Sequence, residues 1–316
     1  MEAIAAHSDL VDNVPQQAGA MKAAFHPLLE AREAEINSFQ TKRFTFGPSE
    51  RHSLDVYFPK TSDSSSAPIL FFVYGGGYAE GAKVLPPPYH LIHKNVGAFF
   101  ANQGLVTVIS DYRLVPHIKF PDPSADIRDA FAFVHEHIDD INAGVHIKGD
   151  IDRVFFMGHS AGAAIISTMM LLPGFVPDDL RKRIQGLVLL GGAYHFRAGP
   201  PPPPVAAYYE NEEGWRRNEP LALLEKASKE LVRNLPPILV LVSENEPRGI
   251  APMSHAFSKT LGEKQGAEVP VLTMKGHNHT SVAFSLFSGV GEDWAHEVVG
   301  WVKHQGQTHG QLRSKV

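Results

Sequence analysis

The chain has 316 residues, of which 43% are hydrophobic and 20% are charged, and its formal net charge is −5. This balance is typical of a folded globular protein, while the negative charge argues against binding to nucleic acid or to anionic membrane surfaces. Because no cysteine is present, disulfides, thiolate metal sites and a cysteine nucleophile are excluded.

Neither a membrane-spanning helix nor a secretory signal is predicted. The longest apolar stretches, such as 238–242, are far shorter than the roughly 20 residues that a spanning helix needs. The first ten residues carry Glu2 and Asp9, and they lack a basic segment followed by an apolar one. We therefore expect a cytoplasmic protein without a membrane partner.

Short apolar runs alternate with helical patterns along the chain, which is typical of a mainly parallel sheet with helices on both faces. The predicted strands cover 43–46, 53–57, 69–74, 106–110, 154–157, 186–190, 238–243 and 269–274. Helices are predicted over about 89–103, 123–137, 160–171, 252–266 and 292–305. The first two strands precede any helical crossover, so we expect them to form an antiparallel edge of an α/β sheet.

Three parts are predicted from these patterns. Residues 1–40 are assigned to a partly amphipathic helical cap segment, 41–305 to one α/β domain and 306–316 to a C-terminal tail. Within the domain, the stretch 196–235 is predicted to fold over the sheet as a lid. Two proline runs, 86–88 and 200–204, are expected to be stiff surface spacers, with an SH3-type docking role left open for the second.

One serine carries the clearest chemical signal. Ser160 lies in Gly158-His159-Ser160-Ala161-Gly162, between an apolar run and a stretch of small, helix-forming residues. A G-x-S-x-G spacing between strand and helix is typical of a nucleophile elbow, in which a strained turn exposes the hydroxyl. The glycines suit the close approach of strand and helix that such a turn creates. The pentapeptide also arises by chance, so the residues elsewhere in the chain must decide whether it is a nucleophile elbow or an ordinary Gly/Ser turn.

A serine hydroxyl is a weak nucleophile and requires a base and an acid that orients the base. In a doubly wound sheet these are expected on loops at the carboxyl ends of later strands. Glu244 and Glu246 follow the seventh predicted strand, and His277 and His279 follow the eighth. The two histidines lie on one loop, and only one of them is expected to reach Ser160.

A run of glycines supplies candidate donors for the negative oxygen of a tetrahedral intermediate. Gly75-Gly76-Gly77 follows the third predicted strand. Without side chains, the amides of Gly76 and Gly77 can approach a reacting carbonyl together with the amide of Ala161. A flexible loop is the alternative interpretation. A dinucleotide site is disfavoured because no glycine follows Gly77 three residues later.

Other polar clusters are better explained structurally. A metal site at His277 and His279 lacks a further ligand at suitable spacing, so no metal or cofactor is predicted. Asp126 and Asp129 share a helix face, but a surface charge cluster or an internal salt bridge explains them better than an acid/base pair. His135 and His137 are assigned to a solvated helix face.

Aromatic residues are concentrated in the glycine loop and the predicted lid. They are Tyr78, Tyr89, Phe196, Tyr208, Tyr209 and Trp215. Aromatic residues at helical spacing often belong to a core, but these segments should overhang Ser160. We therefore expect an apolar or aromatic substrate, with Tyr78, Tyr208, Tyr209 and Trp215 as candidate contacts, together with His159 from the elbow.

With these motifs in place, the chain resembles α/β-hydrolases of the hormone-sensitive-lipase and kynurenine-formamidase-like esterase group over about residues 40–305. Four blocks carry the resemblance: Tyr74-Gly75-Gly76-Gly77-Tyr78, Asp111-Tyr112-Arg113-Leu114-Val115-Pro116, Asp152-Arg153-Val154 leading to the elbow, and Gly276-His277-Asn278-His279. The resemblance implies an α/β-hydrolase fold of about eight strands. It also implies that Ser160 is the nucleophile, that His279 is the base, and that Gly76, Gly77 and Ala161 form the oxyanion hole.

The chain departs from the family pattern at two positions. The family usually has histidine where Tyr74 stands, which puts the anchoring of the glycine loop in question. The family acid is most often aspartate, and the matching position before Pro247 is Glu246, with Glu244 as its rival. The resemblance further implies that Arg113 pairs internally, as a marker of the fold.

Motifs and resemblance together predict a cofactor-free serine hydrolase that cleaves a carboxylic ester of a small to medium hydrophobic or aromatic metabolite through an acyl-enzyme. Formamide or other amide hydrolysis, acyl transfer and lactone formation by the same residues remain alternatives. A non-catalytic ligand-binding receptor on a hydrolase scaffold is the alternative of another class, and the intact set of Ser160, Glu246 and His279 argues against it. The oligomeric state is left open, a homodimer included.

Overall fold

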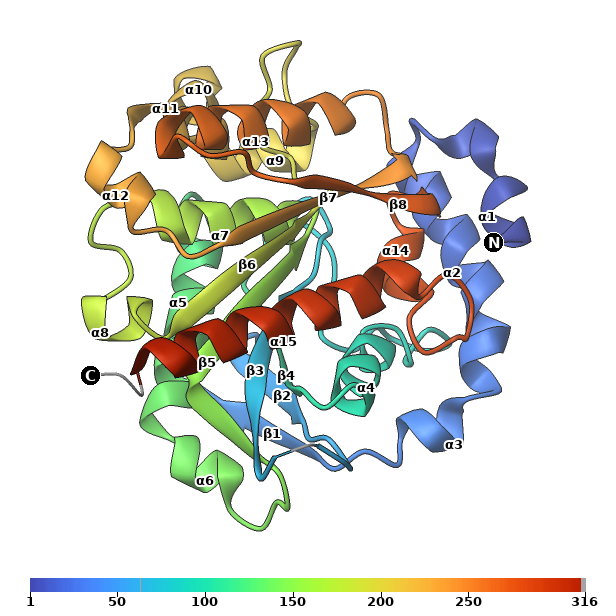
Figure 1. Cartoon of the computed structure of the whole chain (residues 1–316). Helices are drawn as coiled ribbons and strands as arrows, with labels where there is room; N and C mark the ends of the chain where they lie inside the picture. Colours follow the sequence, from blue (N-terminus) through green and yellow to red (C-terminus); the bar gives the residue numbers. More distant parts are fainter. Residues whose placement is uncertain (63, 314–316) are drawn as a thin grey trace.

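The computed structural model describes residues 1–62 and 64–313, and Figure 1 shows it. Its centre is one sheet of eight strands in the order β1-β2-β4-β3-β5-β6-β7-β8. The strands are β1 (Thr41–Thr45), β2 (Ser53–Tyr57), β3 (Ser66–Val73), β4 (Val106–Ser110), β5 (Lys148–His159), β6 (Ile184–Leu190), β7 (Ile238–Asn245) and β8 (Val271–Asn278). β2 pairs antiparallel with both β1 and β4, and all the other neighbouring pairs are parallel. The predicted strands and the antiparallel edge are confirmed.

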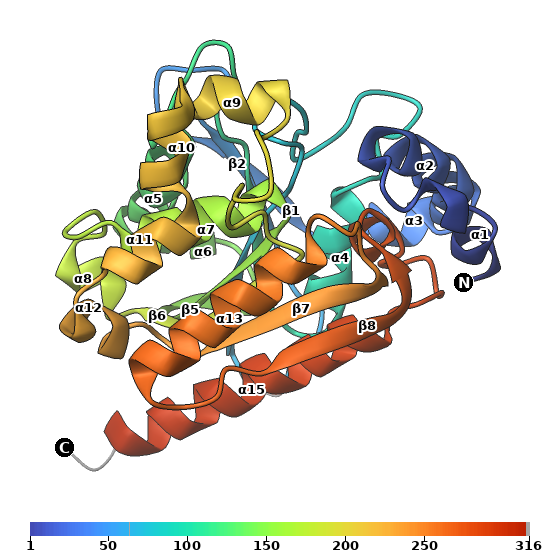
Figure 2. The same ribbon diagram turned by 90° about the horizontal axis from the view of Figure 1, so that it is seen from above.

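Helices cover both faces of this sheet. The crossover helices and the last helix are α4 (Lys94–Asn102), α5 (Asp122–Glu136), α6 (Ile138–Asn142), α7 (Ala161–Leu171), α8 (Asp178–Arg181), α13 (Ala251–Gln265), α14 (Ser281–Phe284) and α15 (Asp293–Arg313). Figure 2 shows β7 and β8 between α13 on one face and α15 on the other. The last helix continues past residue 305, where the sequence suggests the start of a tail. Among the described residues, no helix combines the length and apolar character needed to cross a bilayer.

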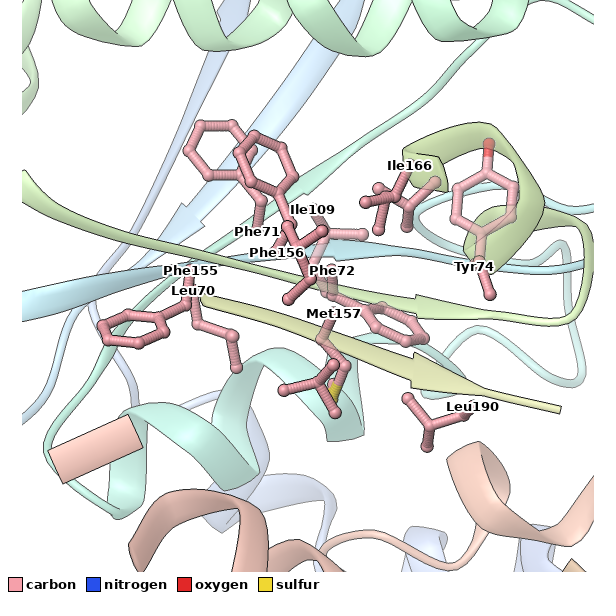
Figure 3. Packing of buried hydrophobic residues seen from close by; sticks show 14 of the residues in the cluster. Leu70, Phe71, Phe72, Tyr74, Ile109, Phe155, Phe156, Met157, Ile166 and Leu190 are labelled. Atoms are coloured by element: carbon pink, nitrogen blue, oxygen red, sulfur yellow. The ribbon is translucent and has the colours of Figure 1, made fainter. Parts of the chain in front are cut away.

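The strands stay together because alternate side chains fill both faces of the sheet. Phe71 of β3 stacks on Phe156 of β5 with ring centroids 4.8 Å apart. Their neighbours Leu70 and Phe155 point to the opposite face, as Figure 3 shows. Fully burying such a side chain contributes roughly 1.5–3 kcal/mol, so these two faces give the central strands their stability. The carboxyl ends of the strands are thereby held in fixed positions.

The N-terminal segment forms a separate group of helices beside the end of β8 (Figure 1). It comprises α1 (Glu2–Ala5), the 3-10 turn η1 (Ser8–Leu10), α2 (Val14–Glu30) and α3 (Glu33–Ile36). Ile4, Met21 and Phe25 form a small buried cluster, and Phe284 of α14 packs against it. This cluster joins the N-terminal helices to the loop that follows β8.

The stretch after β6 folds into α9 (Pro203–Tyr209), α10 (Glu212–Asn218), α11 (Pro220–Lys226) and α12 (Lys229–Arg233). The first proline run, 86–88, is exposed as expected. The second differs from a plain spacer, because Pro201 is buried and Pro203 begins α9. Proline suits the first helical position, where its missing N–H is not needed. Tyr208 and Tyr209 are buried in the main core, so this stretch is an integral layer of the fold.

Candidate active site

The turn between β5 and α7 holds Ser160 in an unusual backbone conformation. Its φ is 55° and its ψ is −120°, a sparsely populated region for a residue with a side chain. The flanking glycines make the close approach possible. A Cβ on Gly162 would lie 2.0 Å from the carbonyl oxygen of Val73, and one on Gly158 would lie 2.6 Å from the Gly162 carbonyl. The geometry is that of a nucleophile elbow.

Two hydrogen bonds connect Ser160 to the loops after β7 and β8. The Ser160 Oγ and His279 Nε2 atoms are 2.9 Å apart. On the other side of the ring, Nδ1 of His279 makes a short hydrogen bond with Oε1 of Glu246. The carboxylate can only accept, so Nδ1 carries a proton and Nε2 is left to accept the serine proton. The arrangement can therefore remove a proton from the Ser160 hydroxyl.

Glu246 remains a charged partner although it is buried. Burial acts to raise the pKa of this carboxyl, but the proximity of His279, its hydrogen bond and the Ser243 N–H outweigh burial. The pKa of Glu246 therefore lies below its ordinary value. The Ser243 N–H donates to Oε2 at 2.8 Å, which leaves Oε1 for the histidine. Glu244 is directed elsewhere, because its carboxylate accepts the Gly276 N–H at the surface.

The neighbouring histidine has a different set of partners. His277 Nδ1 is 2.9 Å from Ser281 Oγ, and its Nε2 donates to the Gly291 carbonyl at 2.8 Å. Burial lowers the pKa of His277, so the ring is held neutral in this pair of bonds. Of the two histidines, the structure brings only His279 to Ser160. Within the described residues, no group of three or more histidines and carboxylates could hold a metal ion.

The glycine loop presents free amides near the elbow. Gly76 and Gly77 have φ values of 126° and 58°, which favour glycine. The Gly76 carbonyl accepts from the amides of Ala79 and Glu80 at 3.0 Å each, which folds the loop tightly. No protein atom in 1–62 or 64–313 accepts a hydrogen bond from the N–H of Gly76, Gly77 or Ala161. These three amides therefore keep an unused capacity to donate a hydrogen bond.

Tyr74, at the position where the family usually has histidine, anchors this loop. Its hydroxyl donates to Asp111 Oδ1 at 2.7 Å and accepts from Arg51 at 2.8 Å. Its ring is stacked on His93 and on Tyr112, with centroid distances of 5.1 and 4.8 Å. The departure from the family pattern is thus accommodated by a buried polar network and a stack of rings.

The next family block has the structural character that the resemblance implies. Arg113 donates to both carboxylate oxygens of Asp126 from its side chain. Asp126 is buried, and it also lies 3.2 Å from the Nε2 atom of His52. Asp129 instead pairs with the adjacent Arg128 near the surface. The internal salt bridge, rather than an acid/base pair, is the arrangement observed.

Three of the predicted aromatic contacts lie together. Tyr78, directly after the free amide of Gly77, stacks on Tyr208 with centroids 4.0 Å apart. Tyr209 packs edge-on against Tyr78 and stacks on Phe120. Trp215 lies on α10 and is a half-buried residue packed on the core. Helix α9 therefore meets the glycine loop where Tyr208 and Tyr209 contact Tyr78.

His159, predicted as a substrate contact, lies against the base. Its Nε2 donates to the carbonyl oxygen of His279 at 2.7 Å, and the two ring centroids are 4.8 Å apart. Removal from water, aided by the nearby His279, lowers the pKa of His159 to about 3. The ring is consequently neutral at physiological pH and keeps one N–H to donate.

Two residues of the site were missed by the sequence reasoning. Gly191 follows β6 with a φ of 51°, and a Cβ there would lie 2.9 Å from Glu246 Oε1 and 3.2 Å from His279 Nδ1. The pair Gly191-Gly192 at the carboxyl end of a predicted strand was the available signal. Gln17 of α2 accepts from the backbone N–H of Thr280 at 3.2 Å, and nothing in its local sequence marks it.

Comparison with known proteins finds esterases among the similar sequences. The BD-FAE family model matches residues 54–175. The chain is 25% identical over 263 residues to a probable isoprenylcysteine alpha-carbonyl methylesterase of Arabidopsis thaliana, covering 78% of this chain and 52% of the relative. It is 23% identical over 266 residues to Esterase LipC of Mycobacterium tuberculosis, covering 78% and 60%. The chain thus spans little more than half the length of these curated relatives.

A solved structure shows the same fold. One of two Rhizomucor miehei esterases, analysed to explain their substrate specificity, superposes with a TM-score of 0.66 at 20% identity. The match covers 89% of each chain. Together with the sheet order, this similarity shows that the fold is that of the α/β-hydrolases, as predicted.

Replacing Gly191 by alanine should damage the site while the protein stays folded. The added methyl group would crowd the bond between Glu246 and His279, and alanine disfavours the positive φ. If the His279 side chain is displaced by about 1 Å, turnover should fall by about 10²-fold. Steady-state assays of ester hydrolysis would measure this loss. Gly199→Ala, with open space around its Cα, is the matched control and should act as wild type. Equal activity of both variants would contradict this role of Gly191.

Replacing His159 by glutamine should reduce the loss of stability in acid. The pKa of His159 is about 3 in the folded protein, whereas an unfolded histidine titrates near 6.5. Between these values the unfolded state binds more protons, so the folded state loses stability as the pH falls. This residue should account for up to about 2 kcal/mol between pH 7 and 5. Urea unfolding at pH 7 and pH 5 measures the free energy of unfolding of both proteins. If this free energy changes with pH equally in wild type and variant, a neutral His159 is contradicted.

Proposed function

We propose that this chain, which has the α/β-hydrolase fold and whose relatives are named esterases, hydrolyses a carboxylic ester with a Ser160–His279–Glu246 triad. The observation that carries the proposal is the line of hydrogen bonds in which His279 meets Ser160 on one side and Glu246 on the other. Such a line is the arrangement that activates a serine hydroxyl at neutral pH.

In the proposed reaction Ser160 Oγ attacks the ester carbonyl carbon, and His279 Nε2 takes its proton. The negative oxygen of the tetrahedral intermediate is stabilised by the free amides of Gly76, Gly77 and Ala161. The imidazolium of His279, held by the Glu246 carboxylate, then protonates the departing alcohol. Water, activated by the same histidine, adds to the acyl group on Ser160, and collapse of this second intermediate releases the acid and restores the hydroxyl.

The surroundings support a small to medium hydrophobic or aromatic ester. The rings of Tyr78, Tyr208 and Tyr209 pack together in the core beside the glycine loop, which makes the surroundings of this loop apolar. The related proteins named above are a methylesterase and an esterase, which supports a carboxylic ester over other acyl compounds. No cofactor enters this chemistry, because every proton transfer is assigned to a side chain.

The first experiment is a panel of p-nitrophenyl esters and aryl formamides of graded size, assayed with purified protein. Wild type should hydrolyse the esters and react with a fluorophosphonate probe. Ser160→Ala should lose on the order of 10⁴-fold in turnover and all labelling, because the nucleophile is gone. Ser254→Ala, which removes a buried hydroxyl without a hydrogen-bond partner in the described part of the chain, should resemble wild type. A wild type that neither labels nor turns over would favour a ligand-binding role instead.

The acid is tested by a pair of matched substitutions. Glu246→Gln should lower kcat by about 10²- to 10⁴-fold, because a neutral amide neither holds the required tautomer nor stabilises the imidazolium. Glu244→Gln should leave kcat nearly unchanged, since Glu244 only accepts the amide of Gly276. The reverse ranking of the two variants would assign the acid to Glu244.

A further inference from the structure

The peptide group between His279 and Thr280 is held at both of its polar ends by side chains from distant parts of the chain. Its carbonyl oxygen accepts from Nε2 of His159 at 2.7 Å. Its N–H, which belongs to Thr280, donates to Oε1 of Gln17 at 3.2 Å and to Oδ1 of Asn278 at 3.2 Å. The backbone directly after the base is thus fixed from the elbow on one side and from helix α2 on the other.

The surroundings determine which nitrogen of His159 carries the proton and which way the amide of Gln17 is oriented. Because His159 is neutral and its Nε2 faces a carbonyl oxygen, that nitrogen carries the proton. The Thr280 N–H can only donate, so the amide of Gln17 must turn its oxygen toward it. Gln17 is fully buried, and its Nε2 has no hydrogen-bond partner among 1–62 and 64–313.

The orientation of this peptide group determines where the imidazole lies. Rotation of the group changes ψ of His279, which moves its backbone relative to the elbow. Such a movement changes the distance between His279 Nε2 and Ser160 Oγ, which is 2.9 Å. Proton transfer needs this distance to stay within about 2.6–3.2 Å. A small rotation of the peptide group is therefore sufficient to weaken the hydrogen bond between His279 and Ser160. His159 also precedes Ser160 directly in the chain. The segment 159–160 therefore carries the nucleophile and also holds the backbone that follows the base.

On the basis of the proposed function, we propose that His159 and Gln17 are positioning residues that hold the peptide group after His279 and thereby place the base against Ser160. Neither side chain needs to touch the substrate for this role. The N-terminal helix α2 then belongs to the catalytic arrangement through its contact with the base loop, beyond its packing on Phe284.

The test compares steady-state kinetics of His159→Phe and Gln17→Met with wild type. Both substitutions keep a similar volume and remove one hydrogen bond to the peptide group. Each should lower kcat by about 10- to 100-fold while KM changes less than about threefold, since substrate contacts are untouched. The double variant should lose less than the product of the single losses, because both side chains act on the same group. His159→Gln, whose amide nitrogen reaches the position of Nε2, should recover most of the lost kcat.

A matched control separates positioning from stability. Asn142 is a buried amide that bonds the N–H and the carbonyl of Gly149 at 2.8 and 3.0 Å, at the far end of β5 from Ser160. Asn142→Leu removes a similar clamp and should lower the melting temperature without changing kcat in the folded protein. If this control loses as much kcat as His159→Phe and Gln17→Met, the positioning role is overturned.

The outcomes also distinguish this inference from the proposed function. A wild type without ester hydrolysis or probe labelling overturns both. An active wild type with unchanged kcat in His159→Phe and Gln17→Met overturns the positioning role and leaves the triad in place. A loss of kcat in His159→Phe that His159→Gln does not recover likewise overturns the role of the donated hydrogen bond.

Discussion

The candidate site depends on one buried ionic hydrogen bond, the one between Glu246 and His279. An ionised carboxylate is stable in such a place only when its oxygens are satisfied, here by the imidazole and by the Ser243 N–H. The bond selects the histidine tautomer that can accept a proton from Ser160. Gly191 leaves the room that this bond requires, since any side chain there would meet both partners.

The parallel sheet explains why these residues can meet. Ser160, Glu246 and His279 follow β5, β7 and β8, and the carboxyl ends of parallel strands lie at the same edge. The filled faces around Phe71 and Phe156 keep those ends at fixed spacing. Loops that would otherwise be mobile are then held individually, the glycine loop by Tyr74 and the base loop by its buried partners. Rigid strands and anchored loops together supply preorganisation.

Local sequence patterns predicted the sheet and the nucleophile elbow, because both are recognised from neighbouring residues. The same patterns placed two glutamates and two histidines on the loops after the last two strands, and the choice of Glu246 and His279 among them was what the family resemblance implied. The same patterns could not reveal Gln17, whose partner lies 263 residues away and whose helix looks like any amphipathic one. His159 was predicted as a substrate contact because the motif gives its position but not the direction of its ring. The second proline run was predicted as a spacer, since burial of Pro201 and the start of α9 depend on tertiary packing.

The contact between α2 and the base loop also bears on how the molecule is made. Gln17 is synthesised 263 residues before its partner Thr280, and Asp12 is synthesised 236 residues before Arg248, with which it pairs. During translation α2 can pack on Tyr89 early, but its contact with Thr280 cannot form until β8 has been made. Closing so long a loop comes late in assembly, because its entropy cost must be met before the contact can form. A nascent chain therefore makes all eight strands before α2 can reach the base loop.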